Sequence, residues 1–219
     1  MTIEQANEYF SSLPEGFAPA EELRAALLTA DVQKVQFVGV AGTAGKTAAA
    51  GLLAAILREA AFHVGFYRAG CEPLSARIAI GGVSVDPMLL CQAAEALSAA
   101  KPLPREAAEL AAAARCFGAA GCKLAVVELP DAGLASALPN MPVCAVTAIG
   151  PDGVSRSVER RAALAAGVMR KDAVCVTAPE QPKAVLSELV VAAAKAECEL
   201  IVPDAEDSTF LEAEKFTSV

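Results

Sequence analysis

The stretch VQFVGVAGTAGKTAAAGLLAAILREA, residues 35–60, decides the fold of this chain of 219 residues. It begins with a β-branched run that ends near Val40, passes through a glycine-rich turn and continues as an Ala/Leu-rich segment of helical length. A strand, a tight turn and a helix in this order predict a buried strand followed by an amphipathic helix that begins near Lys46.

The turn has the composition of a phosphate-binding loop. Glycines let backbone N–H groups converge on phosphate oxygens, and the amino end of the next helix adds partial positive charge. A lysine there reaches the β and γ phosphates, and the threonine hydroxyl binds Mg²⁺. The strict pattern has glycine five residues before Gly45, where this chain has Val40. An ordinary strand-to-helix turn with an exposed lysine is the alternative. The candidate nucleotide-binding residues are Gly42, Thr43, Ala44, Gly45, Lys46 and Thr47.

A carboxylate is needed beside such a loop to hold the metal, and Glu128 is the candidate. It ends the apolar run LAVVE, at the carboxyl edge where open α/β sheets bind ligands. From there a carboxylate ligates Mg²⁺ directly or through water. The alternative is a surface glutamate just past a strand end. The predicted metal ligands are Thr47 and Glu128.

Short apolar runs alternate with helical segments along most of the chain. The runs are 35–40, 63–67, 123–129, 143–149, 173–178 and 199–202, and the helical segments are 46–60, 87–99, 105–120, 157–169 and 181–197. Continuous apolar strands between helices predict a parallel sheet buried on both faces, hence a three-layer α/β/α domain. Two short helices, Ile3–Leu13 and Pro19–Thr29, are expected before the first strand. A hairpin is expected around Gly81-Gly82.

Composition excludes several classes of protein. Apolar residues make up 55% and charged residues 20%, which is incompatible with a disordered chain. No apolar stretch reaches the roughly 18 residues of a membrane span, and no basic segment precedes an apolar one at the start. The net charge is −8, and the one basic group, Arg156, Arg160 and Arg161, is interpreted as a solvated helix face, so nucleic acid is not an expected partner.

The seven cysteines show no CxxC pair, which predicts reduced, mostly buried thiols and a cytoplasmic protein. Cys144 and Cys175 lie within predicted strands and are expected in the core, whereas Cys71 lies in a Gly/Pro-rich loop and is expected to be exposed. The lone His63 is interpreted as structural, and Asp152 as a turn residue.

The ordered set of these segments resembles the amino-terminal, ATP-binding part of folylpolyglutamate synthases, in the Mur ligase superfamily. FVGVAGTAGKTAA resembles the family loop V-A-G-T-N-G-K-G-S, which also has valine at the position of Val40. The segments MTIEQANEYFSSLP, AAILREAAFHVGFY, RIAIGGVSV, LAVVEL, VTAIGPD and VTAPEQPKAVLSEL follow in the family's order. The resemblance implies a Mur-ligase central-domain fold, with ATP and Mg²⁺ as cofactors. It also implies ATP-dependent amide ligation of glutamate through an acyl phosphate.

Departures from the family pattern predict an impaired site. The family asparagine of the loop is Ala44, the metal-binding histidine is replaced at Gly153, and the carbamylated lysine aligns with Ala165. The arginine and aspartate of the family's V-G-x-G-G-R-x-D-A-T-N segment have no counterparts at the matching positions of residues 129–136, and the S-P-H segment is replaced in residues 68–73.

The domain expectation is a single ATP-binding domain over residues 1–219. Its amino-terminal helices occupy residues 1–30, its acidic tail 203–219, and the family's carboxy-terminal ligase domain is lacking. We expect weak ATP–Mg²⁺ binding and little or no ligase activity from the chain alone. The alternatives are a non-catalytic interaction or oligomerisation module that kept the fold, and a separate subunit that supplies the missing half.

Overall fold

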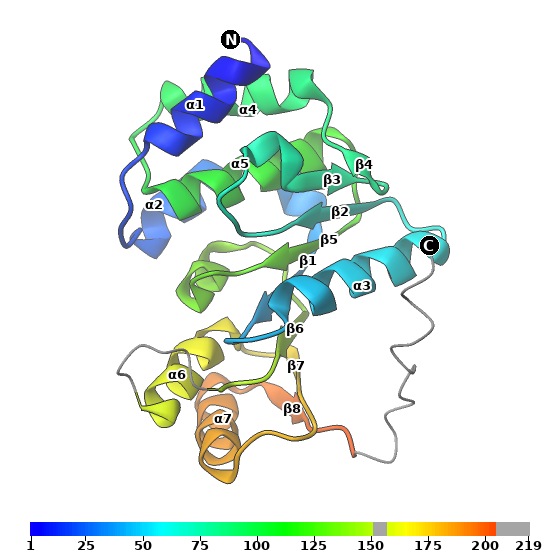
Figure 1. Cartoon of the computed structure of the whole chain (residues 1–219), viewed down its shortest axis with the longest axis vertical. Coiled ribbons are helices and arrows are strands. Elements are labelled where there is room, and N and C mark those ends of the chain that lie inside the picture. Colours follow the sequence, from blue (N-terminus) through cyan, green and yellow to red (C-terminus); the bar gives the residue numbers. More distant parts are fainter. Residues whose placement is uncertain (151–156, 205–219) are drawn as a thin grey trace.

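The computed structural model describes residues 1–150 and 157–204, in which one eight-stranded sheet has the order β4-β3-β2-β5-β1-β6-β7-β8. The strands are β1 (Gln36–Ala41), β2 (Val64–Tyr67), β3 (Ile78–Ile80), β4 (Val83–Ser84), β5 (Leu124–Glu128), β6 (Val143–Val146), β7 (Val174–Thr177) and β8 (Glu199–Ile201). All neighbours pair in parallel except β2 with β3 and β3 with β4. The predicted α/β fold with a mostly parallel sheet is confirmed (Figure 1).

The helices lie close to their predicted positions. They are α1 (Ile3–Ser12), α2 (Ala20–Leu27), α3 (Lys46–Glu59), α4 (Pro87–Ser98), α5 (Arg105–Ala119), α6 (Val158–Ala165) and α7 (Lys183–Ala196). Four 3₁₀ turns join them in the described residues: η1 (Val32–Lys34), η2 (Leu74–Ala76), η3 (Ala132–Ala137) and η4 (Ala166–Val168). The helix predicted over 157–169 is shorter than expected, because its last turn tightens into η4.

Alternation along the strands divides the core between the two faces of the sheet. Phe37 and Ala41 of β1 point into the larger core, formed with α1, α2, α4, α5, α6 and α7. Val38 and Val40 point to the opposite face and pack with Ala50 and Ala54 of α3. Figure 1 shows α1, α2, α4 and α5 around one half of the sheet, and α6 and α7 around the other.

The described residues cover the second face incompletely, so for this part of the chain the prediction that the sheet is buried on both faces is wrong. α3 packs over β1, β5 and β2. Strand register places apolar side chains of β6, β7 and β8 on the same face as Val38 and Val40, beyond α3. We call these residues the open strip: Val143, Ala145, Val174, Val176 and Ile201. Val143 is 38% exposed and Ile201 41% exposed.

The hairpin predicted around Gly81-Gly82 is confirmed. These glycines have φ of 60° and 86° and join β3 to β4. A two-residue turn with positive φ at both positions matches the twist of antiparallel strands and favours glycine.

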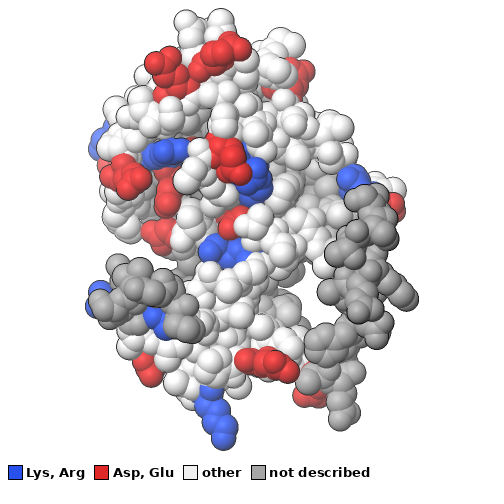
Figure 2. All heavy atoms as spheres, viewed as in Figure 1, with Lys and Arg blue, Asp and Glu red and all other residues white. Residues whose placement is uncertain are grey.

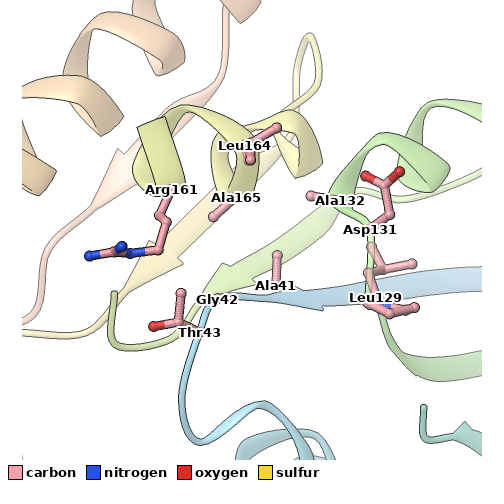
Figure 3. A pocket seen from close by; sticks show the side chains of 10 residues that line it. Ala41, Gly42, Thr43, Leu129, Asp131, Ala132, Arg161, Leu164 and Ala165 are labelled. Atoms are coloured by element: carbon pink, nitrogen blue, oxygen red, sulfur yellow. The ribbon is translucent and has the colours of Figure 1, made fainter. Parts of the chain in front are cut away.

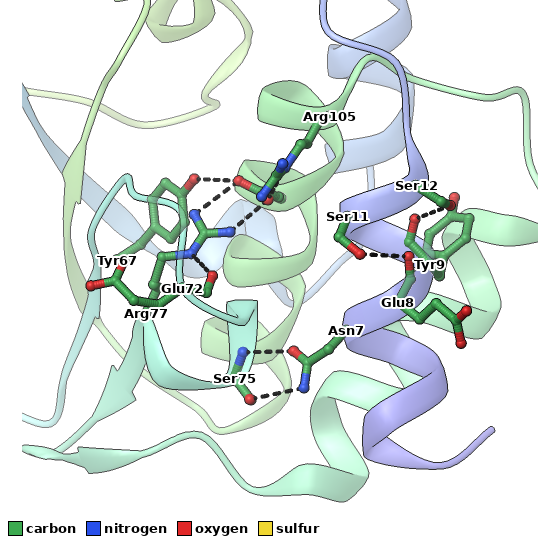
Figure 4. Close-up of polar contacts among 11 residues, drawn as sticks. Asn7, Glu8, Tyr9, Ser11, Ser12, Tyr67, Glu72, Ser75, Arg77 and Arg105 are labelled. Carbon is green, nitrogen blue, oxygen red and sulfur yellow. Dashed lines mark hydrogen bonds and ion pairs between the residues drawn. The ribbon is translucent and has the colours of Figure 1, made fainter.

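A buried ion cluster links α5 to the segment before β3. Glu109 accepts hydrogen bonds from both terminal nitrogens of Arg77, at 2.9 and 2.5 Å, and from Nε of Arg105 at 2.9 Å. Arg77 is 2% exposed and also donates from Nε to the carbonyl of Glu72 (Figure 4). Because a buried charge is costly without partners, these bonds fix the chain between β2 and β3.

Candidate nucleotide-binding site

The predicted loop lies at the carboxyl edge of the sheet, where β1 is flanked by β5 and β6. The amide of Leu129 donates to the carbonyl of Val40 at 2.9 Å, and the amide of Thr147 donates to that of Ala41 at 2.9 Å. Three loops, 42–45, 129–131 and 147–150, therefore meet around the end of one strand. Open α/β sheets bind ligands at this kind of position.

The two loop glycines are required for different reasons. Gly42 has a φ of 134°, and a Cβ there would lie 2.2 Å from Oγ1 of Thr147. Gly45 precedes α3 with a φ of 80°, a left-handed conformation that costs glycine little. Gly42 thus permits the close approach of two loops, and Gly45 sets the sharp entry into the helix.

The predicted metal ligands lie together. Thr47, in the first turn of α3, donates its hydroxyl hydrogen to Oε2 of Glu128 at 2.9 Å. Glu128 ends β5 and is 5% exposed. Strand register pairs it with Val40, on the face of the sheet that α3 covers. The alternative of a surface glutamate is therefore wrong.

Lys46 folds back over the loop. Its ammonium group donates to the carbonyl of Gly42 at 3.0 Å. In a phosphate-binding loop the lysine contacts the β and γ phosphates. Phosphates bound in this way would therefore lie at the end of the loop nearest Gly42.

Backbone groups of the 147–150 segment occupy part of the loop. The amides of Thr43 and Ala44 both donate to the carbonyl of Ala148 at 3.2 Å. The hydroxyl of Thr43 donates to the same carbonyl at 3.0 Å and accepts from the amide of Gly150 at 2.8 Å. Within the described parts of the chain, the amides of Gly45, Lys46 and Thr47 have no such partner. The sequence does not reveal the role of Ala148, because the contact is made by its backbone carbonyl.

Gln181 holds the 147–150 segment in place and was also missed. Its Nε2 donates to the carbonyl of Thr147 at 2.9 Å, and its Oε1 accepts from the amide of Ile149 at 3.1 Å. A polar side chain that follows a strand and precedes a helix is a weak signal, since many such residues are exposed.

A cavity of about 330 Å³ lies on the side of the loop away from Glu128. The phosphate loop supplies Ala41, Gly42 and Thr43 to its wall, residues 129–132 form another side, and α6 supplies Arg161, Leu164 and Ala165 (Figure 3). The interpretation of the basic residues as a solvated face holds for Arg160, which is exposed, but is wrong for Arg161, which is half-buried. Arg156 and Asp152 lie outside the described residues.

The residues at the loop fit Mg²⁺ bound together with a nucleotide. Mg²⁺ keeps several waters and takes one or two protein oxygens plus phosphate oxygens. Thr47 and Glu128 supply two oxygens at one point. In the described parts of the chain, no group of three His, Cys, Asp or Glu side chains forms a metal site. Gly153, which replaces the family histidine, lies outside them.

No broad basic surface appears on the face drawn in Figure 2, where basic side chains stand apart among acidic ones. With a net charge of −8, an anionic ligand must be recognised by local groups of the loop rather than by a broad positive field. No described helix is long and apolar enough to cross a bilayer.

A scan against protein-family models finds no match, and a search of curated proteins finds no relative. Solved structures of folylpolyglutamate synthases, in contrast, match the fold. E. coli FolC in complex with DHPP and ADP gives a TM-score of 0.77 at 20% identity, over 91% of this chain and 51% of that one. The apo form of L. casei FPGS gives 0.78 at 19% identity, over 92% and 54%. The bifunctional folylpolyglutamate synthase/dihydrofolate synthase from Yersinia pestis CO92 gives 0.78 at 21% identity, over 92% and 52%.

These comparisons define the class of fold, the α/β fold of the folylpolyglutamate synthases. The resemblance inferred from the sequence is thereby confirmed at the level of fold. The chain spans about half the length of the solved structures that it matches.

Proposed function

We propose that this chain binds ATP and Mg²⁺ at the loop of residues 42–47. The observation that carries the proposal is the 2.9 Å contact between Oγ1 of Thr47 and Oε2 of Glu128, beside a glycine loop at the start of α3. Solved proteins of the same fold include complexes with nucleotides: E. coli FolC with ADP, and FPGS with AMPPCP.

The loop offers the groups that a triphosphate needs. The amides of Gly45, Lys46 and Thr47 lie at the amino end of α3, where the helix dipole favours negative charge. The ammonium of Lys46 exchanges its bond to Gly42 for phosphate oxygens, and the hydroxyl of Thr47 with the carboxylate of Glu128 holds the metal. Mg²⁺, when bound, neutralises phosphate charge.

Two loop amides must be released for full contact with the phosphates. Those of Thr43 and Ala44 are held by Ala148, so a ligand that uses them displaces that carbonyl. The exchange costs free energy because the carbonyl of Ala148 gives up its hydrogen bonds to the loop. We therefore expect weaker ATP binding than at a fully open loop.

Titration calorimetry with ATP and MgCl₂ tests the proposal. We expect saturable binding by the natural chain and loss of binding in Lys46→Ala. Lys195→Ala, which removes an exposed lysine at the end of α7, is the matched control and should bind normally. Absence of binding by the natural chain, or equal binding by the Lys46 variant, contradicts the proposal.

We further propose that the chain alone is impaired as an ATP-dependent amide ligase. Ala165 occupies the position that the family resemblance assigns to a carbamylated lysine, and it lies in the wall of the cavity. The family resemblance implies that this lysine supports a second Mg²⁺, and loss of such a positive centre lowers the rate by orders of magnitude. Robust glutamate ligation by the isolated chain would refute this.

The open strip favours a second candidate function, a self-associating module that kept the fold. Contiguous exposed apolar surface is a common mark of a protein contact. The face that carries the strip is continuous with the apolar packing under α3, so a second copy covers it with an equivalent face. Light scattering at increasing concentration tests this candidate.

A further inference from the structure

We propose that Arg161 reads the terminal phosphate of ATP and makes the chain prefer ATP to ADP. The inference rests on the proposed function, because it requires a nucleotide in the loop. It goes further by assigning the cavity between the loop and α6 to the end of the triphosphate chain.

The position of Lys46 indicates the direction in which the phosphate chain would lie. Lysine in such a loop contacts the β and γ phosphates. Lys46 places its ammonium 3.0 Å from the carbonyl of Gly42, at the beginning of the loop. The terminal phosphate is therefore expected near Gly42, and the inner phosphates nearer the amides that begin α3.

The cavity adjoins the end of the loop at Gly42. Gly42 and Thr43 form part of the cavity wall, and Arg161 of α6 forms another part, with its guanidinium on the Thr43 side and turned away from Asp131 (Figure 3). Arg161 is half-buried and shares the cavity wall with Leu129 and Leu164. A guanidinium in partly apolar surroundings forms stronger contacts with phosphate than an exposed one, and its planar fork matches two phosphate oxygens.

The proposed metal ligands and Arg161 lie on opposite sides of the loop. Glu128 and Thr47 lie on the α3 side of the sheet, whereas Arg161 approaches from the opposite side. A triphosphate between them would have the metal on one flank and the guanidinium on the other. Asp131 also lines the cavity and repels negative charge, so the anion is expected on the Arg161 side.

Affinity for ATP and for ADP, measured by calorimetry with MgCl₂ for matched variants, tests the inference. Arg161→Gln should weaken ATP binding about tenfold or more, the usual effect of losing a hydrogen bond to a charged group, and leave ADP within about twofold. Arg160→Gln is the control, because it removes the same charge from the next residue of the helix, which is exposed. Arg161→Lys keeps the charge without the fork and should lose less ATP affinity than the glutamine variant.

The outcomes separate the two proposals. If the natural chain binds neither nucleotide, the proposed function fails and the role of Arg161 falls with it. If the chain binds ATP through Lys46 but Arg161→Gln behaves like Arg160→Gln, only the inference about Arg161 is overturned. Equal weakening of ATP and ADP by both Arg161 variants, or loss of folding in both, shows a structural role and also overturns it.

Discussion

At the scale of single residues, the loop shows how one carbonyl controls a potential binding site. Ala148 accepts from two amides and one hydroxyl of the phosphate loop. Gln181 fixes the segment that carries this carbonyl. The side chains that the sequence nominates are present, but the availability of the backbone between them depends on a neighbouring segment. For the proposed nucleotide binding, the affinity would therefore depend also on Ala148 and Gln181, which no loop motif contains.

The burial of two thiols predicts that the folded state becomes less stable at alkaline pH. Burial raises the pKa of the Cys116 thiol to about 12 and that of Cys122 to about 11. The unfolded chain titrates first, near the ordinary thiol pKa of about 8.5, and so loses protons that the folded chain keeps. The stabilisation that the protonated thiol of Cys116 gives the folded state is complete below that pH, and it is lost as the pH rises toward 12.

Urea unfolding measured across this range checks the effect. We expect the free energy of unfolding to fall by about 1.4 kcal/mol per pH unit for each such thiol. Cys116→Ala should flatten this fall, whereas Cys71→Ala, at an exposed position, should leave it unchanged. An identical pH slope in the natural chain and the Cys116 variant would show that this thiol does not titrate differently in the folded state.

At the scale of secondary-structure elements, two helical glycines predict opposite effects of the same substitution. A Cβ on Gly51, in α3, would meet only Cζ of Phe66 at 3.9 Å, an ordinary contact. A Cβ on Gly118, in α5, would lie 2.9 Å from backbone atoms of Asp31 and Val32. The first helix has room for alanine, and the second packs too closely on the chain before β1.

We expect Gly51→Ala to raise the free energy of unfolding by about 0.5–1 kcal/mol, because alanine is the better helix former. Gly118→Ala should lower it by about 1–3 kcal/mol, because overpacking forces a backbone shift. Urea denaturation of both variants measures the difference. Stabilisation by both would mean that the contact between α5 and η1 yields readily.

At the scale of the whole molecule, the sequence predicts layers better than it predicts their coverage. Alternation of apolar runs and helices is enough to expect a parallel sheet, and the Gly81-Gly82 pair to expect its antiparallel hairpin. The runs around Val143 and Val174 are as apolar as a strand buried on both faces, so their pattern does not reveal that one face lies open. Coverage depends on where α3 packs, which is a tertiary property.

The residues of the candidate site also differ in whether the sequence predicts them. Lys46, Thr47 and Glu128 are predictable because strand ends and helix starts converge at one sheet edge. Arg161 is not, because its place in the cavity wall depends on how α6 packs on α7, η3 and η4. Arg161 lies one turn of α6 before Ala165, and the sequence does not show that both residues line the same cavity.

The open strip predicts how the molecule behaves in concentrated solution. The exposed side chains of Val143 and Ile201 favour burial against a second copy. Apolar area removed from water contributes about 25 cal/mol per Å². We expect light scattering to show a mass that rises with concentration in the natural chain. Val143→Lys and Ile201→Lys should shift it toward the monomer, because each would bury an unpaired charge.

Val190→Lys is the matched control for this experiment. Val190 is 52% exposed on α7, which packs on the other face of the sheet. The same charge placed there should leave the association unchanged, so general solubilisation by an added lysine is separated from the loss of one surface. A monomeric mass at every concentration in the natural chain would remove self-association as a function of the open strip.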